Sequence, residues 1–141
     1  MDNDPLVYLN GIMTPLSKAK ISVLDRGFIF GDGIYEVIPI YERKPFRPAQ
    51  HLARLFRGLN SIGIDNPYTE QEWLGLVEKV TRADSADDQL VYMQVTRGVA
   101  KRTHAFPNIE LTPTVFIMSN PLTLPSAQAR ANGVVCVTME D

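Results

Sequence analysis

The chain of 141 residues is poor in cysteine and histidine, and contains only Cys136, His51 and His104. A single cysteine excludes a disulfide within the chain, and these residues meet no ligand spacing of a metal site. We therefore expect no bound metal. Cys136 lies in the apolar run VVCVTM, where we expect a buried, inert thiol rather than a nucleophile or a ligand.

Long hydrophobic runs and an excess of one charge are also missing. No apolar run approaches the roughly 20 residues that cross a membrane, and the start MDNDPLVYLNG has neither the basic nor the apolar region of a signal peptide. A net charge of −2 gives no general attraction to nucleic acid or to an anionic membrane. We expect a cytoplasmic protein that binds a small molecule, with no nucleic-acid or membrane partner.

The sequence has no phosphate-binding P-loop and no dinucleotide-binding fingerprint. Its most glycine-rich stretch, DRGFIFGDG, places Gly27, Gly31 and Gly33 around two phenylalanines. This density of glycine predicts a tightly turning loop rather than a regular element.

What is present is typical of one folded domain. The hydrophobic fraction is 45% and the charged fraction 21%, which are ordinary values for a globular protein of this length. Asn10-Gly11 between two short apolar runs predicts an opening β-hairpin. Further strands are predicted in the stretches IYEVIPIYE, QLVYMQVTR, PTVFIM and GVVCVTM.

Two helices interrupt these strands. Apolar residues spaced as one helical stripe predict the first from Pro48 to Ile62, and Gly63 suits its end. The second is expected from Thr69, which forms a capping box with Glu72, to about Thr81. The order of elements favours an α+β fold, a two-layer sandwich in which both helices pack on one face of a mostly antiparallel sheet.

The strand IYEVIPIYE has two features that need an explanation. Pro39 cannot donate a ladder hydrogen bond, so the strand is predicted to lie at an edge or to be bulged there. Glu36 shares a face with three isoleucines, and a buried carboxylate needs a cation. Arg26 and Arg97, each beside a glycine, are its expected partners.

The stretch VTRGVAKRTHAFP gathers positive side chains in one loop. Such a cluster is often a solvated face. Arg102, however, offers a planar fork for a carboxylate or phosphate, and His104 can add a second donor. A general-base role for His104 is less favoured, because no carboxylate lies in the same loop. Arg54 lies away from the apolar stripe of its helix, so its periodicity predicts a solvent-facing side chain.

Taken together, the stretches DRGFIFGDGIYEVIPIY, HLARL and QVTRGVAKRTHAFP closely resemble the N-terminal part of class IV pyridoxal-phosphate aminotransferases. The resemblance is strongest to the D-amino acid branch, because of the Arg-x-His-x-Phe-Pro element that begins at Arg102. The glycine loop followed by Tyr-Glu is shared, in looser form, with branched-chain aminotransferases and aminodeoxychorismate lyases.

The resemblance implies roles for particular residues. Arg54 would hold the phosphate of pyridoxal 5'-phosphate, against the prediction from periodicity. Tyr35, Arg102 and His104 would bind the substrate α-carboxylate, and Val37 would line the side-chain pocket. The loop 98–107 would reach the other subunit of a homodimer, and the substrates would be an amino acid and a 2-oxo acid.

The resemblance also implies that the chain is incomplete as an enzyme. Residues 1–120 would form the N-terminal α+β domain, and residues 121–141 a linker and the first strand of a C-terminal domain. The family's Schiff-base lysine would lie beyond residue 141, so no catalytic residue is assigned and the isolated chain is expected to be inactive. Other hypotheses are a branched-chain aminotransferase, an aminodeoxychorismate lyase, or a non-catalytic domain for anion binding or assembly.

Overall fold

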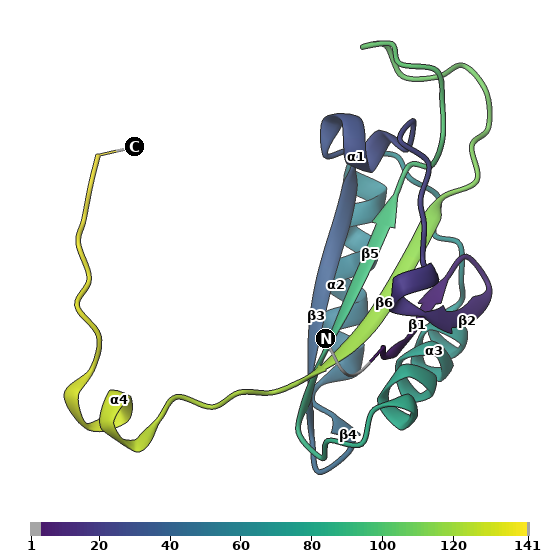
Figure 1. The fold of residues 1–141 in the computed structure, drawn as a ribbon. Coiled ribbons are helices and arrows are strands. Elements are labelled where there is room, and N and C mark those ends of the chain that lie inside the picture. Colours follow the sequence, from purple (N-terminus) through teal and green to yellow (C-terminus); the bar gives the residue numbers. More distant parts are fainter. Residues whose placement is uncertain (1–3, 141) are drawn as a thin grey trace.

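The computed structural model describes residues 4–140 and shows two helices packed on one face of an antiparallel sheet (Figure 1). The strands are β1 (Leu6–Leu9), β2 (Ile12–Pro15), β3 (Gly33–Tyr41), β4 (Lys44–Pro45), β5 (Gln89–Thr96) and β6 (Thr114–Pro121). The helices are α1 (Arg26–Phe30), α2 (Pro48–Ser61), α3 (Glu70–Ala83) and α4 (Ala127–Asn132), with a 3-10 turn, η1, at Leu16–Lys18. The predicted α+β sandwich is confirmed.

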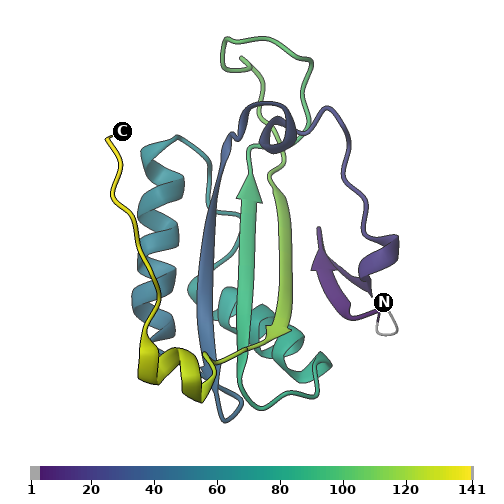
Figure 2. The same cartoon turned by 60° about the vertical axis from the view of Figure 1, so that its left-hand side comes forward.

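The sheet has the strand order β2-β1-β6-β5-β3-β4, and every neighbouring pair is antiparallel. Figure 2 shows the long strands β3, β5 and β6 side by side with α2 and α3 on one side of them. Because side chains alternate along a strand, one face of the sheet packs on the helices and the other is left open. The core lies between the helices and the first of these faces.

Local chemistry accounts for the confirmed elements. Asn10 and Gly11 both have positive φ, at 47° and 94°, and join β1 to β2 as a two-residue hairpin requires. The capping box is present at the start of α3, where the hydroxyl of Thr69 accepts the Glu72 amide and the Glu72 carboxylate accepts the Thr69 amide. The stripe of α2 buries Leu52, Leu55 and Leu59.

The predicted edge or bulge at Pro39 is not found, because β3 lies between β5 and β4, and Pro39 instead faces the short strand β4. The Pro39 carbonyl accepts a hydrogen bond from the Phe46 amide at 2.8 Å, so its nitrogen faces away from β5. The register between β3 and β5 runs without a bulge through Pro39↔Leu90. The missing N–H therefore costs the β3–β5 ladder no hydrogen bond.

Several sequence predictions of local structure are wrong. The glycine-rich stretch is not a loop throughout, because residues 26–30 form α1, which the Asp25 side chain caps by accepting the Gly27 amide at 2.8 Å. The strand predicted at 133–139 is not formed. Residues 122–140 extend away from the sheet (Figure 1), where no neighbouring strand pairs with them, and Cys136 is exposed rather than buried.

Candidate active site

Glu36 lies on the helix-covered face of β3 and is 1% exposed. The sequence predicted Arg26 or Arg97 as its partner, and this prediction is wrong. Its partners are Arg54 and His51 from α2. Arg54 donates through Nε to Oε2 at 2.7 Å and through Nη2 to Oε1 at 2.6 Å, and His51 Nδ1 lies 3.0 Å from Oε1. The prediction failed because Arg26 and Arg97 are bound elsewhere, to Asp32.

These hydrogen bonds decide the charge of Glu36. Burial acts to raise the pKa of this carboxyl, but the hydrogen bonds from Arg54 and His51 outweigh it, and the Val37 amide adds a further donor. The pKa of Glu36 is therefore below its ordinary value, and the group is an anion at neutral pH. The Glu36 carboxylate in turn raises the pKa of Arg54 through the same hydrogen bonds.

Arg54 is both exposed, as its helical periodicity predicts, and bound to a buried carboxylate, which the sequence did not predict. Its side chain is 66% exposed, yet one edge of its guanidinium binds the buried Glu36. A guanidinium has five N–H donors in a fixed plane. Two of them face Glu36, so Nη1 and the second hydrogen of Nη2 remain for an external oxyanion.

Tyr35 and Val37 lie on the other face of β3, the one that no helix covers. Tyr35 is 68% exposed and stacks on Tyr92 of β5, with ring centroids 6.0 Å apart. The strand therefore presents Tyr35 and Val37 to the open face and Glu36 to the helices. Tyr35 is next to Glu36, the partner of Arg54, in the sequence, but the side chains of Tyr35 and Glu36 lie on opposite faces of the sheet.

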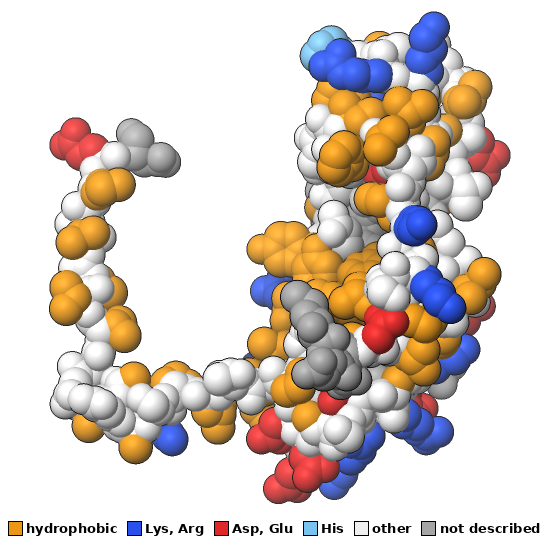
Figure 3. Space-filling model, in the orientation of Figure 1, with side chains coloured by type: hydrophobic (Ala, Val, Ile, Leu, Met, Phe, Trp, Pro, Cys, Tyr) orange, Lys and Arg blue, Asp and Glu red, His pale blue; other side chains and the backbone are white. Residues whose placement is uncertain are grey.

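Arg102 and His104 lie in the segment 97–113, which extends past α1 at one end of the sheet (Figure 1). Both side chains are exposed and both lie against Phe30 of α1. The Arg102 guanidinium carbon is 5.4 Å from the Phe30 ring centroid, and the His104 and Phe30 ring centroids are 5.7 Å apart. Figure 3 shows Lys, Arg and His side chains gathered at this end of the molecule.

The predicted site residues thus lie in three separate groups in the structure. Arg102 and His104 lie together on Phe30, Tyr35 and Val37 lie together on the open sheet face, and Arg54 is joined to β3 through Glu36. No hydrogen bond between these groups is present within residues 4–140. The open-face pair, Tyr35 and Val37, and the loop pair, Arg102 and His104, therefore do not form one site within the described part of a single chain.

Sequence reasoning missed the residues that support the loop. Asp32, the acidic residue of the GDG stretch, binds both Arg26 and Arg97. The signal was visible, since three charged side chains lie beside glycines at the ends of predicted elements. Their pairing is a contact between distant parts of the chain, however, and periodicity does not report such contacts.

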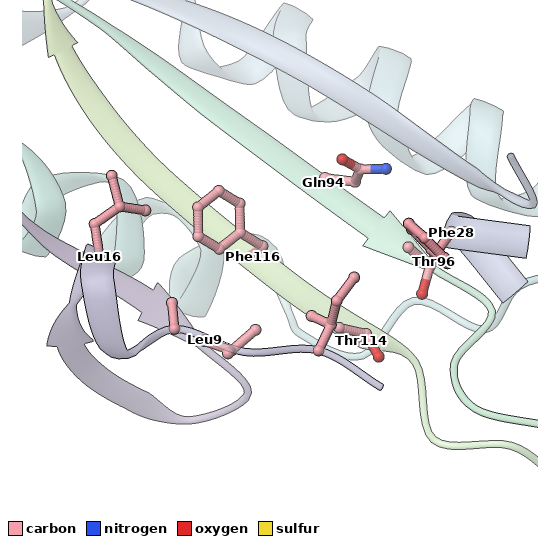
Figure 4. Close-up of a pocket in the computed structure, with 10 residues that line it drawn as sticks. Leu9, Leu16, Phe28, Gln94, Thr96, Thr114 and Phe116 are labelled. Carbon is pink, nitrogen blue, oxygen red and sulfur yellow. The ribbon is translucent and has the colours of Figure 1, made fainter. Parts of the chain in front are cut away.

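The open face also carries a pocket of about 390 Å³ between β5, β6 and the segment that leads to α1. Figure 4 shows side chains that line it, among them Leu9, Leu16, Phe28, Gln94, Thr96, Thr114 and Phe116. The lining is mainly apolar, and none of the predicted site residues contributes to it. The pocket nevertheless adjoins Tyr35, because its lining residue Gln94 is the β5 neighbour of Tyr35 on the open face. Among residues 4–140, no helix is long and apolar enough to cross a membrane.

A family model described as amino-transferase class IV matches residues 33–141. The chain belongs to this family. The match contains all five predicted site residues, from Tyr35 to His104, and begins at the glycine where β3 starts.

Among its curated relatives, the class IV chain is 39% identical over 135 residues to a D-alanine aminotransferase of Staphylococcus aureus. It is 36% identical to a D-alanine aminotransferase of Bacillus licheniformis. Each match covers 96% of this chain, but only 48% and 47% of the relative. The chain therefore spans about half the length of the curated relatives that it matches.

Solved structures of the family share the fold. A branched-chain aminotransferase of Thermoproteus uzoniensis with norvaline has a TM-score of 0.74 at 27% identity, over 86% of this chain and 42% of that one. A 4-amino-4-deoxychorismate lyase of Pseudomonas aeruginosa has a TM-score of 0.73 at 27% identity, over 92% and 44%. A branched-chain aminotransferase of Escherichia coli, at 20% identity, supports the fold alone with a TM-score of 0.80.

Proposed function

We propose that the chain is the N-terminal half of an aminotransferase that exchanges an amino group between a D-amino acid, such as D-alanine, and a 2-oxo acid. The observation that carries this proposal is the pair of exposed side chains, Arg102 and His104, held side by side on Phe30. A planar fork and a neighbouring imidazole are suited to a carboxylate. The similarity to D-alanine aminotransferases over 96% of the chain supports the same substrate class.

The cofactor of this proposed enzyme would be pyridoxal 5'-phosphate, and the chemistry of Arg54 fits its phosphate. The guanidinium is two-thirds exposed, its inner edge is fixed by Glu36, and its outer N–H groups have room for phosphate oxygens. Bound pyridoxal phosphate supplies an electron sink that stabilises negative charge at the substrate Cα. Arg54 and Glu36 contribute the anchoring of the phosphate.

The chain's other site residues would orient the substrate. Arg102 and His104 would donate to the two oxygens of the α-carboxylate, and the exposed hydroxyl of Tyr35 would add a donor from the open sheet face. Fixing the carboxylate at several points decides which face of Cα meets the cofactor. Val37, on the same face as Tyr35, would limit the space for the substrate side chain.

Because the loop 98–107 extends away from Tyr35 and Val37, we propose that it serves the site of a second subunit in a homodimer. The lysine that the family uses to hold the cofactor would come from chain beyond residue 141. Residues 1–120 would then form the N-terminal domain, and residues 121–141 the connection to the next one.

A second candidate is a lyase or branched-chain aminotransferase of the same family, which the structural neighbours favour. Assays of the full-length protein separate the two. We expect it to transfer the amino group of D-alanine to 2-oxoglutarate, and to use L-branched-chain amino acids far more slowly. Turnover that needs no 2-oxo acid acceptor would indicate a lyase instead, and preference for L-leucine or L-valine would indicate the branched-chain activity.

A further inference from the structure

A cluster of three charged residues lies beneath the loop that carries Arg102 and His104. Asp32 is at its centre, and Arg26 and Arg97 donate to its two oxygens. The distances are 2.7 Å from Arg26 Nε, and 2.9 and 3.0 Å from Nε and Nη2 of Arg97. All three side chains are largely buried, with exposures of 4%, 10% and 13% for Arg26, Asp32 and Arg97.

The two arginines of this cluster have different second partners. Arg97 also donates to the carbonyls of Ile62 and Gly63, at 2.6 and 2.8 Å, which fixes the end of α2. Arg26 instead donates through Nη1 to the carbonyl of Thr103 at 3.1 Å. Thr103 is the residue between Arg102 and His104, so Arg26 is the member of the cluster that reaches the loop at the proposed carboxylate-binding pair.

Two aromatic rings complete the support. The guanidinium carbon of Arg26 lies 4.8 Å from the ring centroid of Phe30, the ring on which Arg102 and His104 rest. Phe106, at the far end of the loop, lies over Arg97 at 4.6 Å and over Arg26 at 5.9 Å, although it is 67% exposed. An exposed phenylalanine gains little from burial, so these cation–π contacts are its main attachment.

The loop that carries Arg102 and His104 needs these contacts with Arg26, Arg97 and Phe30, because it contains little regular structure of its own. Its beginning is held by hydrogen bonds from the Arg26 amide to the Gly98 carbonyl and from the Ala100 amide to the Leu24 carbonyl. From residue 101 to 110 no helix or strand is present. Each residue kept in one backbone conformation costs about 1–2 kcal/mol of entropy, so side-chain contacts must offset the ordering of this segment.

We infer that Arg26 is a positioning residue, which holds Arg102 and His104 in place for the substrate carboxylate by linking Asp32 to the Thr103 carbonyl. This inference rests on the proposed function, since it concerns the proposed carboxylate-binding pair. Arg26 touches no reacting group. It acts through the backbone of Thr103, which lies between Arg102 and His104. A planar guanidinium suits this role, because Nε and Nη1 bind different acceptors while its face covers Phe30.

The substitution Arg26→Lys tests the geometry while keeping the charge. A single ammonium keeps the ion pair with Asp32 but cannot also reproduce the planar bridge to Thr103 and the contact with Phe30. In the full-length enzyme loaded with pyridoxal phosphate, we expect Arg26→Lys to raise the KM for D-alanine about five- to twentyfold while kcat changes less than about threefold. Cofactor affinity should stay unchanged, because Arg54 is untouched.

Phe106→Leu is the second variant, and it guards against a folding failure at the buried Arg26. Because Phe106 is mostly exposed, its replacement should leave the fold intact and raise KM in the same direction by a smaller factor. Arg82→Lys is the matched control, since Arg82 forms an exposed ion pair with Glu78 on α3, far from the loop. It should change neither KM nor kcat.

A double-mutant cycle separates positioning from a general loss of structure. If Arg26 acts through Arg102 and His104, Arg26→Lys should have little further effect on KM in an Arg102→Ala background. Hydrogen exchange of the amides at 101–106 should be faster in Arg26→Lys and Phe106→Leu, and unchanged in Arg82→Lys. Equal KM factors in both backgrounds, or unchanged loop exchange, would overturn the inference.

The same set of variants distinguishes failure of the inference from failure of the proposed function. If Arg102→Ala leaves the KM for D-alanine unchanged, the carboxylate-binding role is wrong and the proposed function is overturned at this site. If Arg102→Ala raises KM strongly while Arg26→Lys and Phe106→Leu do not, the proposed function stands and the positioning role of Arg26 is wrong.

Discussion

Glu36 and Arg54 form a two-pronged ion pair that joins β3 to α2, with N–O distances of 2.7 and 2.6 Å. The pair is strongly asymmetric, because the Glu36 carboxylate is 1% exposed and the Arg54 side chain 66% exposed. The strand supplies a fixed anion, and the helix supplies a cation whose outer edge faces solvent. This asymmetry lets one arginine stabilise the fold and still present donors to a ligand.

If Arg54 binds the phosphate, removing its side chain should weaken the cofactor more than the substrate. A charge-assisted hydrogen-bonded contact contributes roughly 1.5–3 kcal/mol, so Arg54→Ala should raise the Kd of pyridoxal phosphate about ten- to hundredfold. The measurement is a titration of the full-length apoenzyme followed by cofactor absorbance.

Pyridoxal without its phosphate provides the control for this titration. Its affinity for the apoenzyme should be the same in the wild type and in Arg54→Ala, because the lost contact is to the phosphate alone. Equal Kd values of the two proteins for pyridoxal phosphate would return Arg54 to a solvent-facing role beside Glu36.

The Glu36 carboxylate should make stability depend on pH. Its pKa is lower in the folded protein than in the unfolded chain, so its contribution is fully present above about pH 4.3 and is lost as the pH falls through the folded pKa. Glu36→Gln should therefore lower the free energy of unfolding at pH 7 by about 1–3 kcal/mol. The difference from wild type should shrink towards zero in more acidic solution.

Glu78→Gln is the matched control for Glu36→Gln in urea unfolding. Glu78 also pairs with an arginine, but both side chains are mostly exposed, so its loss should cost less than about 1 kcal/mol. A Glu36→Gln protein as stable at pH 7 as the Glu78→Gln protein would contradict the importance of the buried pair.

Local patterns in the sequence predicted most of the fold. The apolar stripe of α2, the capping box at Thr69 and the turn at Asn10-Gly11 each depend on residues close together in the chain. Such features are visible because the physical cause and its effect lie within a few positions. The alternation along β3 likewise placed Glu36 and the isoleucines on one buried face.

The failures share one cause, which is dependence on partners distant in the chain. Glu36 was correctly expected to need a cation, but Arg54 is 18 residues away on a helix whose orientation the pattern does not give. The strand predicted at 133–139 has the right residues and no neighbour among residues 4–140 to pair with. Helix α1 has only five residues, and besides its local cap at Asp25 it depends on distant partners, because the Arg26 amide donates to the Gly98 carbonyl and Thr114 donates to Asp25.

Gly98 should be essential for the start of the loop. Its φ is 97°, and a Cβ atom at this position would overlap the carbonyl oxygen of Thr112. Gly98→Ala should therefore lower the free energy of unfolding by about 2 kcal/mol or more, through strain and displacement of the loop. Urea unfolding of the full-length protein measures this loss.

Gly75→Ala should have the opposite effect on stability in the same urea unfolding assay. Gly75 lies inside α3, and no atom stands within 4 Å of a Cβ placed there. Alanine should raise stability by about 0.5–1 kcal/mol, because glycine is a poor helix former. A Gly98→Ala protein as stable as the Gly75→Ala protein would show that the close approach of Gly98 to Thr112 is not decisive.

The isolated chain should not catalyse transamination. The proposed function places the Schiff-base lysine beyond residue 141 and gives that role to none of Lys18, Lys20, Lys44, Lys79 and Lys101, so residues 1–141 should bind no cofactor covalently. The test is to add pyridoxal phosphate, D-alanine and a 2-oxo acid to the purified chain. Neither imine absorbance nor turnover is expected, and detection of both would place the catalytic lysine within these residues.

The last prediction is that Arg102 and His104 act in the site of a neighbouring subunit. The loop extends past α1 (Figure 1), away from the open face that holds Tyr35 and Val37. A two-fold dimer would bring each loop to the other site, so that catalysis and association depend on each other. Arg102→Ala should then raise the KM for amino acids strongly and leave cofactor binding nearly intact, because the lost contact is to the carboxylate.

Complementation decides whether the loop acts in this way. Arg102→Ala is co-expressed with a variant that lacks the Schiff-base lysine, and each is expected to be nearly inactive alone when D-alanine is kept near the wild-type KM. A heterodimer would contain one site with both a lysine and an intact loop, so random pairing should restore about a quarter of the wild-type activity per site. A mixture no more active than its parents would show instead that the loop serves the subunit from which it comes.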